Sequence, residues 1–184
     1  TGAPWPAGRP GGKQAHRLIR KHRVTPLILT RAEFRNSADV FPMEYFDIRE
    51  RHTVLHGDDE TASLQLNRAH LRHQLEERLR GTVATLRQML IASKGRDRAV
   101  DRSTKNLFGS LRAQLKGALR LLDADPPADD GALIRAVGER FGVDPSPFAQ
   151  LRELRRAKNK ATLELAGRIL AQLEALIRSV DSIT

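Results

Sequence analysis

Asp47 is the side chain whose surroundings point most directly to chemistry. It lies in residues 43–48, where the side chains alternate with a period of two. This period predicts a β-strand, and Pro42 fits the first position of such a strand. A carboxylate inside an apolar strand costs free energy unless it is paired, hydrogen-bonded or bound to metal. Asp47 is therefore a candidate catalytic or metal-binding residue, and the simpler alternative is a strand-end aspartate that is exposed to water or pairs with Arg49 or Arg51.

A second set of carboxylates follows a Gly-Ser pair. Gly109-Ser110, twelve further residues and Asp123-Ala124-Asp125 match the spacing of the Gly-Ser and Asp-x-Asp signature of polymerase-β-like nucleotidyltransferases. That chemistry needs a turn that holds the triphosphate and two strand-borne carboxylates that hold divalent metal ions. The intervening residues have a helical leucine period, and prolines follow directly after Asp125. We therefore interpret this match as the end of a helix and not as a site.

The histidines offer weaker hypotheses. His52 and His56 are four residues apart, and His70 and His73 are three apart, so each pair would share one helix face, as zinc ligands require. Neither pair has the third ligand or general base that a metalloprotease motif supplies. Two Arg-x4-His spacings, one of them ending at His56, also fit HEPN-type ribonucleases. Such spacings arise by chance in an arginine-rich chain.

Composition limits the class of protein. The chain has 184 residues, 40% of them hydrophobic, which is enough for a sizeable core. It has no cysteine, no stretch of apolar residues long enough for a membrane span, and no signal peptide at its start. These features predict a cytoplasmic protein without a disulfide framework. Because the sequence does not begin with methionine, we also expect a fragment or a processed product.

The net charge of +10 is concentrated at the N-terminus. Residues 1–36 carry eight basic side chains and one acidic one, whereas the rest of the chain carries 24 basic and 21 acidic groups. This charge favours contact between the arm and the phosphates of a nucleotide or RNA. A solvated helix face and tail is the alternative interpretation.

The chain is expected to fall into three regions. Residues 1–24 are predicted to be a basic, partly disordered arm with a short helix, residues 25–62 a small irregular or strand-containing segment, and residues 63–184 a helical bundle. Within the middle region, residues 27–29 form an apolar run that suggests a short strand. Thr30 is expected to cap a helical turn, with Glu33 in the capping-box position.

Residues 63–184 have the apolar period of helices. Leucines recur at spacings of three and four from residue 71 onward, and a second leucine stripe follows the break at residues 94–97. Pro126 and Pro127 exclude a helix interior, and Asp130 is expected to cap a third helix. A fourth helix follows Pro145, and Asn159 and Lys160 begin the last. Five helices with short connections predict an antiparallel bundle, and the fold class is therefore mainly α.

Two segments of the sequence resemble a known family. The segments SADVFPMEYFDIRERHTVLHG and HLRHQLEERLRG, within a match over roughly residues 16–180, resemble the C-terminal part of a bacterial nucleotidyltransferase-like family. The resemblance implies a small catalytic α/β domain with Gly-Ser and Asp-x-Asp motifs, followed by a helical bundle that binds substrate. Residues 25–62 would then be the C-terminal edge of the α/β domain, with one or two strands.

By this resemblance, Asp47 falls at the position of the third metal-site carboxylate. Its role would be to complete the acidic site, orient Mg²⁺ and deprotonate the acceptor hydroxyl, with an NTP as the second substrate of the parent protein. No Gly-Ser turn followed by a strand-borne Asp-x-Asp precedes Thr25. We therefore expect the catalytic half to lie outside this chain, and the chain alone to be inactive and to bind no metal or nucleotide cofactor.

The function that the resemblance implies is the substrate- or partner-binding helical part of a metal-dependent nucleotidyltransferase. Such an enzyme would transfer a nucleoside monophosphate from an NTP to a hydroxyl acceptor. Its expected partners are the catalytic half, phosphates that contact the basic arm, and a second copy of the chain, with no membrane partner. The alternative is a non-catalytic helical interaction module, either a toxin-antitoxin-type partner or an oligomerisation bundle.

Overall fold

The computed structural model describes residues 17, 19–21, 27–156 and 160–183. Its contacts divide the chain into two compact units, Thr1–Asn36 and Ser37–Thr184. The described residues are mainly helical and contain no β-strand, so the mainly α class is confirmed. The predicted boundaries after residues 24 and 62 stay predictions.

Among the described residues of the first unit, α2 spans Arg31–Asn36. The predicted capping box at its start is confirmed, because the Thr30 N–H donates to Glu33 Oε2 at 2.7 Å and the Glu33 N–H donates to Thr30 Oγ1 at 3.1 Å. Residues 27–29 have no regular structure, so the strand predicted there is wrong. Most of the predicted basic arm lies outside the described residues.

The second unit begins with α3 (Pro42–Glu50), where the sequence predicted a strand. That prediction is wrong for residues 43–48, and with it the strand-containing remnant is not found among the described residues. Proline fits the first turn of a helix as well as the start of a strand, because its missing N–H would have no helical partner there. In the folded chain this segment is helical and contacts side chains of the long helices that follow it, Gln74 and Arg120 among them. The short 3₁₀ helix η1 (Glu60–Ser63) follows α3.

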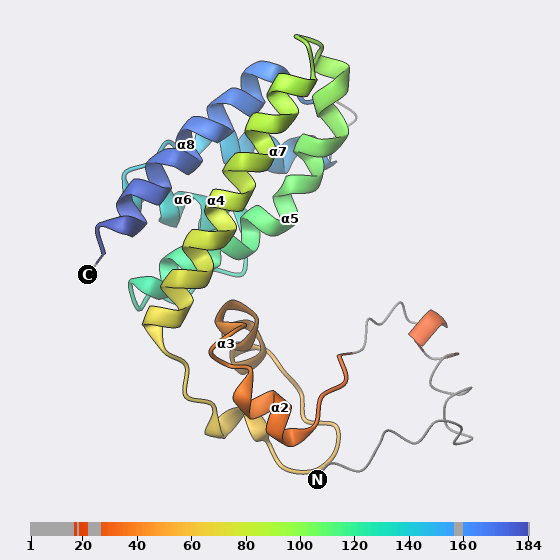
Figure 1. Cartoon of the computed structure of the whole chain (residues 1–184), viewed down its shortest axis with the longest axis vertical. Helices are drawn as coiled ribbons and strands as arrows, with labels where there is room; N and C mark the ends of the chain where they lie inside the picture. Colours follow the sequence, from red (N-terminus) through yellow and green to blue (C-terminus); the bar gives the residue numbers. More distant parts are fainter. Residues whose placement is uncertain (1–16, 18, 22–26, 157–159, 184) are drawn as a thin grey trace. The chain divides into compact units, whose positions relative to one another are not determined.

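The predicted bundle of five helices is confirmed, and α4 packs on both α5 and α8 within it. Figure 1 shows these three long helices side by side, with α6 and α7 behind them. The helices are α4 (Arg68–Ala92), α5 (Asp97–Leu121), α6 (Asp130–Phe141), α7 (Ser146–Arg156) and α8 (Leu163–Asp181).

Side-chain caps fix the starts of three bundle helices, α4, α6 and α8. Asn67 caps α4 by accepting the Ala69 N–H at 2.8 Å. The helix α6 is capped by Asp129, one residue before the predicted Asp130, which instead is the first helical residue. Thr162 caps α8, so the predicted start at Lys160 is wrong, and Asn159 lies outside the described residues. Each cap satisfies an N–H group that has no partner inside the helix.

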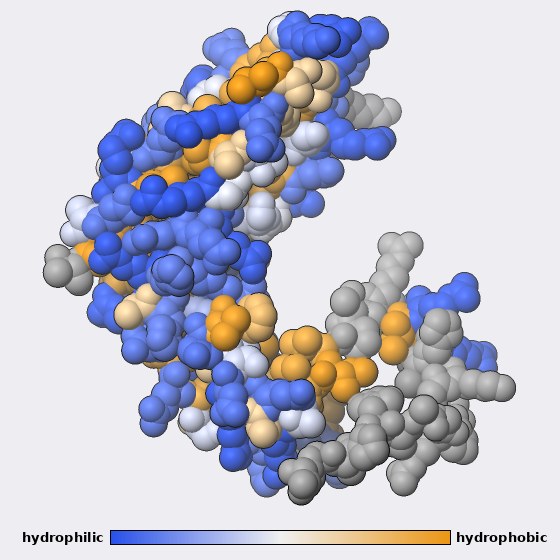
Figure 2. Space-filling model, in the orientation of Figure 1, coloured by the Kyte–Doolittle hydropathy of each residue, from blue (hydrophilic) through white to orange (hydrophobic). Residues whose placement is uncertain are grey.

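The leucine stripes form the core, as predicted. Side chains of α4, α5 and α8 meet there with little or no exposed area, and hydrophilic side chains cover most of the bundle face shown in Figure 2. The largest fully buried members include Leu71, Leu75, Leu79, Leu86, Leu111, Leu115, Leu119 and Phe148.

Candidate functional site

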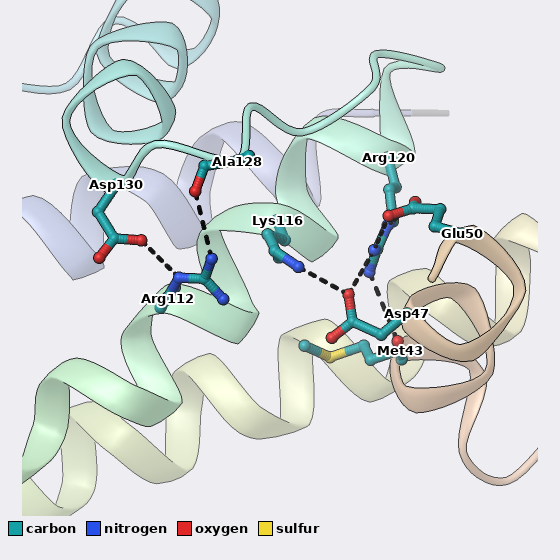
Figure 3. A network of polar contacts seen from close by, with 8 residues as sticks. All are labelled: Met43, Asp47, Glu50, Arg112, Lys116, Arg120, Ala128 and Asp130. Carbon is teal, nitrogen blue, oxygen red and sulfur yellow. Dashed lines mark hydrogen bonds and ion pairs between the residues drawn. The ribbon is translucent and has the colours of Figure 1, made fainter. Parts of the chain in front are cut away.

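Asp47 projects from α3 toward two cations of α5. Its Oδ1 accepts hydrogen bonds from Lys116 Nζ at 2.9 Å and from Arg120 Nη2 at 2.6 Å (Figure 3). Glu50, one turn further along α3, pairs with the same guanidinium through bonds of 2.7 and 2.6 Å. We call these four residues, Asp47, Glu50, Lys116 and Arg120, the α3 joint.

The cations of the α3 joint are buried and its carboxylates are partly exposed. The side chains of Lys116 and Arg120 are 6% and 4% exposed, against 45% for Asp47 and 32% for Glu50. A buried cation is costly unless a carboxylate compensates it, and removing that partner leaves an uncompensated charge. The carboxylates of α3 therefore stabilise the buried end of α5, and the cations fix α3 in place.

Two opposing effects act on the Asp47 carboxyl. Its partial burial raises the pKa, but the hydrogen bonds from Arg120 and Lys116 and their positive charges outweigh burial. The net pKa of Asp47 lies below its ordinary value, so the carboxyl is ionised at neutral pH. This is the state that the two cations require.

Polar contacts with α4 complete the attachment of α3. The Met43 N–H donates to Gln74 Oε1 at 2.8 Å, which satisfies one of the free N–H groups at the start of α3. The Gln74 amide also donates to Glu44 at 2.9 Å, and Arg78 reaches the same carboxylate at 3.4 Å. The position of α3 is therefore determined by side chains of two bundle helices.

The α3 joint does not fit a divalent metal ion. Oδ1 of Asp47 already accepts hydrogen bonds from two positively charged groups, and their charges oppose a further cation. Among the described residues, no three acidic or histidine side chains come together as a metal site requires. The predicted metal and catalytic role of Asp47 stays a prediction that concerns the parent protein.

The sequence pointed to the wrong partners for Asp47. The alternative interpretation was a strand-end aspartate that is exposed to water or pairs with Arg49 or Arg51, whereas its hydrogen bonds come from Lys116 and Arg120, about seventy residues away. A signal for them exists, since each directly follows a core leucine and the two are four residues apart. That spacing is equally typical of a solvated helix face, so the sequence alone does not distinguish the two.

A hollow of about 620 Å³ opens beside the start of α3, between α4 and α5. A smaller hollow of about 90 Å³ lies next to it, contains Asp47 in its wall, and shares Arg78, Ser110 and Gln114 with it. We call the larger hollow the α3 groove. Its wall consists of Val40, Phe41, Gln74, Glu77, Arg78, Gly81, Thr82, Thr85, Leu107, Ser110 and Gln114.

The wall of the α3 groove contains an unpaired hydrogen-bond acceptor. Gln114 is 3% exposed, and its amide nitrogen donates to Thr82 Oγ1 at 2.7 Å and to the Arg78 carbonyl at 3.3 Å. Its Oε1 accepts no hydrogen bond among the described residues. A buried acceptor without a donor costs about 1–3 kcal/mol. The groove also carries the exposed aromatic ring of Phe41 and the hydroxyl of Ser110, so both apolar and polar contacts are available to a ligand.

The other candidate residues do not form a site. Gly109 and Ser110 lie inside α5, and Asp123 follows its end and pairs with Arg68 at 2.7 Å, so the interpretation of this match as a helix end is confirmed. His52 lies 3.2 Å from both Asp59 and Thr61 in the loop after α3. These contacts order the loop.

His70 and His73 lie exposed in the first turns of α4. They therefore stay accessible to solvent and belong to no group of three or more acidic or histidine side chains, among the described residues, that could hold a metal ion.

No known protein family, curated protein or solved structure matches the chain. Among the described residues, no helix combines the length and the apolar character that crossing a membrane requires.

Proposed function

We propose that this chain is the helical binding portion of a nucleotidyltransferase-like protein and that the α3 groove holds its hydroxyl-bearing acceptor. In the parent protein, the catalytic half would supply the Gly-Ser and Asp-x-Asp motifs, with Mg²⁺ and an NTP. That half would transfer a nucleoside monophosphate to the acceptor hydroxyl.

One observation carries the proposal: the two sequence segments that resemble the family both line the α3 groove. They are residues 37–57 and 70–81, which are separated by twelve residues and are in contact through α3 and α4. Six of the eleven residues that line the groove come from these two segments, although the segments make up a small part of the chain. The six are Val40, Phe41, Gln74, Glu77, Arg78 and Gly81.

The chemistry of the wall suits an acceptor with hydroxyl or amine groups. Oε1 of Gln114 has almost no exposed area and no donor partner, so it would accept an O–H or N–H group of a ligand once the Gln114 side chain turns toward the groove. The Phe41 ring, 46% exposed, offers a flat apolar surface for the body of such a ligand. Small-molecule sites combine an apolar wall with a few polar groups that fix orientation, as this groove does.

Asp47 contributes to this function by position. Its bonds to Lys116 and Arg120 fix α3, and α3 is continuous with Val40 and Phe41 at the rim of the groove. Asp47 is thus a positioning residue in the described structure. A metal-binding role would require the catalytic half to displace at least one of the two cations from its Oδ1.

The same contacts favour a second function, a non-catalytic helical interaction module. The Asp47 carboxylate joins α3 to the bundle through two buried cations, and this structural role accounts for its position without a metal ion. In that case the groove would bind a protein partner and no nucleotide would be transferred. The DNA that encodes the residues upstream of Thr1 separates the two functions: a Gly-Ser pair followed by Asp-x-Asp supports the enzyme, and their absence supports the module.

The groove itself can be tested with one substitution. Gly81 lies on α4 in the groove wall, and a Cβ added there meets no atom within 4 Å, so Gly81→Trp is expected to place a large side chain in the groove. Gly167→Trp on α8 is the matched control, because a Cβ there is equally unobstructed and Gly167 is outside the groove. Glycine is a poor helix former, so neither substitution should weaken its helix.

The assay uses the protein extended by its encoded upstream residues, radiolabelled NTPs, Mg²⁺ and total cell extract as the source of acceptors. We expect labelled acceptor with the parent sequence and with Gly167→Trp, and loss of label with Gly81→Trp. Labelling that persists in Gly81→Trp contradicts the role of the groove. Absence of labelling in every protein contradicts the transferase proposal.

A further inference from the structure

We propose that the end of the bundle around the α4–α5 turn binds the phosphate backbone of nucleic acid. This end, at the top of Figure 1, presents basic side chains from the turn, from the first turns of α5 and from the segment before α8. We call it the basic end. Its members are Lys94, Arg96, Arg98, Arg102 and Lys160.

The cations of the basic end are available to a ligand. All five are exposed, and none has a side-chain hydrogen bond or ion pair with another described residue. Some exposed arginines elsewhere on the bundle are paired, since Arg80 pairs with Asp181 at 2.9 Å and Arg87 with Glu174 at 2.8 Å. The basic end is thus a group of neighbouring cations that intramolecular carboxylates do not compensate.

The two acids nearest in sequence are engaged in holding this end together. Asp97 accepts the Leu163 N–H at 2.9 Å, and Asp101 accepts the Ala161 N–H at 2.8 Å and pairs with Lys105 at 3.0 Å. These bonds join the start of α5 to the segment before α8. They bring Lys160 close enough to Asp101 for its charge to help lower the pKa of that carboxyl, after the larger effects of the Ala161 N–H and Lys105.

The composition of the basic end favours phosphate. Three of its five cations are arginines, whose planar forks bind phosphate oxygens through two parallel hydrogen bonds. Arg98 and Arg102 are four residues apart on α5, so they share a face and lie about 6 Å apart along the helix axis. That span covers about two successive phosphates of one strand of a duplex.

An anionic membrane fits this surface less well. Peripheral helices that bind membranes need a continuous apolar face beside their cations. At this end, Ile91 in the last turn of α4 is the large apolar side chain that is strongly exposed, at 81%. One such residue provides no apolar face. A nucleic acid therefore matches the basic end better than a lipid surface.

The basic end is separate from the α3 groove. The two have no residue in common, and along α5 the nearest groove residue, Leu107, lies five residues or about 7.5 Å beyond Arg102. Binding of nucleic acid at this end does not depend on the proposed transferase function. A negative result in the nucleic-acid binding experiment would not contradict the proposed transferase function.

The test measures binding of the full chain to a fluorescent single-stranded RNA by anisotropy, between about 50 and 200 mM salt. The variant Arg96→Glu/Arg98→Glu/Arg102→Glu removes three cations of the basic end. Glutamate in the first turns of α5 interacts favourably with the helix dipole, so the variant should fold, and circular dichroism checks this. The matched control, Arg135→Glu/Arg140→Glu/Arg178→Glu, makes the same change in net charge at exposed positions on α6 and α8.

We expect the basic-end variant to weaken binding at least ~10-fold and to reduce the steepness of the plot of log K against log salt by about 2, which corresponds to three lost contacts with a single strand. The control should change the affinity less than about 3-fold, since long-range charge effects are screened at these salt concentrations. Parallel measurements with single-stranded DNA and duplex DNA identify the preferred nucleic acid, and any of the three supports the proposal.

Four results would overturn the proposal. The first is that the parent chain does not bind RNA. The second is that the basic-end variant and its control lose the same affinity for RNA. The third is that the parent chain binds polyglutamate or phosphatidylserine vesicles as tightly as RNA, or more tightly. The fourth is a loss confined to Arg17→Glu/Arg20→Glu/Lys21→Glu, which would assign the binding to the N-terminal arm.

Discussion

Along α5, basic residues near the end of the helix are buried against carboxylates, whereas those near its start face solvent. Lys116 and Arg120 are almost inaccessible and join α3 to the bundle through Asp47 and Glu50. Arg98 and Arg102 are exposed and have no described partner. The residue types and their spacing of four are similar in both halves, so burial decides what each pair of cations does.

The difference separates stability from recognition. A buried cation must be compensated within the protein, so its loss changes the free energy of unfolding. An exposed cation is already solvated and contributes little to stability, but it remains free to bind an external anion. Substitutions in the two halves should therefore change different measured quantities.

The largest effect is expected for Arg120→Met in the α3 joint. This substitution removes the cation that binds both Asp47 and Glu50, and we expect it to lower the free energy of unfolding by about 3 kcal/mol, the magnitude of breaking a buried ion pair. Urea denaturation measures the change. Arg102→Met is the matched control on the same helix and should change stability by less than about 0.5 kcal/mol. Similar losses in both variants would contradict the distinction between the two halves.

A smaller loss is expected for Asp47→Asn. The amide keeps the shape of the carboxyl and an acceptor oxygen but removes the negative charge that compensates the buried Lys116 ammonium. We expect a loss of about 2 kcal/mol at pH 7, less than for Arg120→Met because Glu50 still compensates the guanidinium. Thermal and urea unfolding both report it. An unchanged free energy of unfolding in Asp47→Asn would show that the Lys116 ammonium is solvated at no cost.

The pH dependence sharpens the role of Asp47. Its pKa is lower in the folded protein than its ordinary value, so its contribution to stability is present above about pH 4 and is lost as the pH falls through the lower, folded value. The difference in unfolding free energy between the parent chain and Asp47→Asn should therefore be largest near pH 7 and shrink toward acid. Urea titrations at several pH values measure this. A difference that stays constant on acidification would contradict the pKa direction.

The smallest effect on stability is expected at the basic end. Arg98→Glu should change the free energy of unfolding by less than about 0.5 kcal/mol, because the side chain is exposed and the new acid lies in the first turn of α5. Its affinity for RNA should nevertheless fall. A loss of stability comparable to that of Asp47→Asn would show that Arg98 has a structural role.

The sequence predicted the helices better than it predicted the contacts between them. The leucine stripes of α4 and α5 and the capping box of Thr30 and Glu33 are local patterns, and the structure confirms both. The segment around Asp47 was predicted as a strand because six residues are too few to separate a period of two from a helical one. Its helical form depends on Gln74 and Arg120, which lie far away in the chain.

The candidate site was predictable in part. Asp47 was singled out because a carboxylate among apolar residues needs a partner, and it has two. The identity of those partners was not predictable, since Lys116 and Arg120 have the spacing of an ordinary solvated face. The groove beside α3 is formed by residues that are adjacent only after folding, and Gln114 gave no signal in the sequence.

The most direct test of Asp47 as the anchor of α3 is a double-mutant cycle with Arg120. Unfolding free energies of the parent chain, Asp47→Asn, Arg120→Met and the double variant give the coupling between the two side chains. We predict a coupling of at least about 1.5 kcal/mol, against less than about 0.5 kcal/mol for the exposed pair of Glu44 and Arg78. A coupling near zero between Asp47 and Arg120 would contradict the structural role of Asp47.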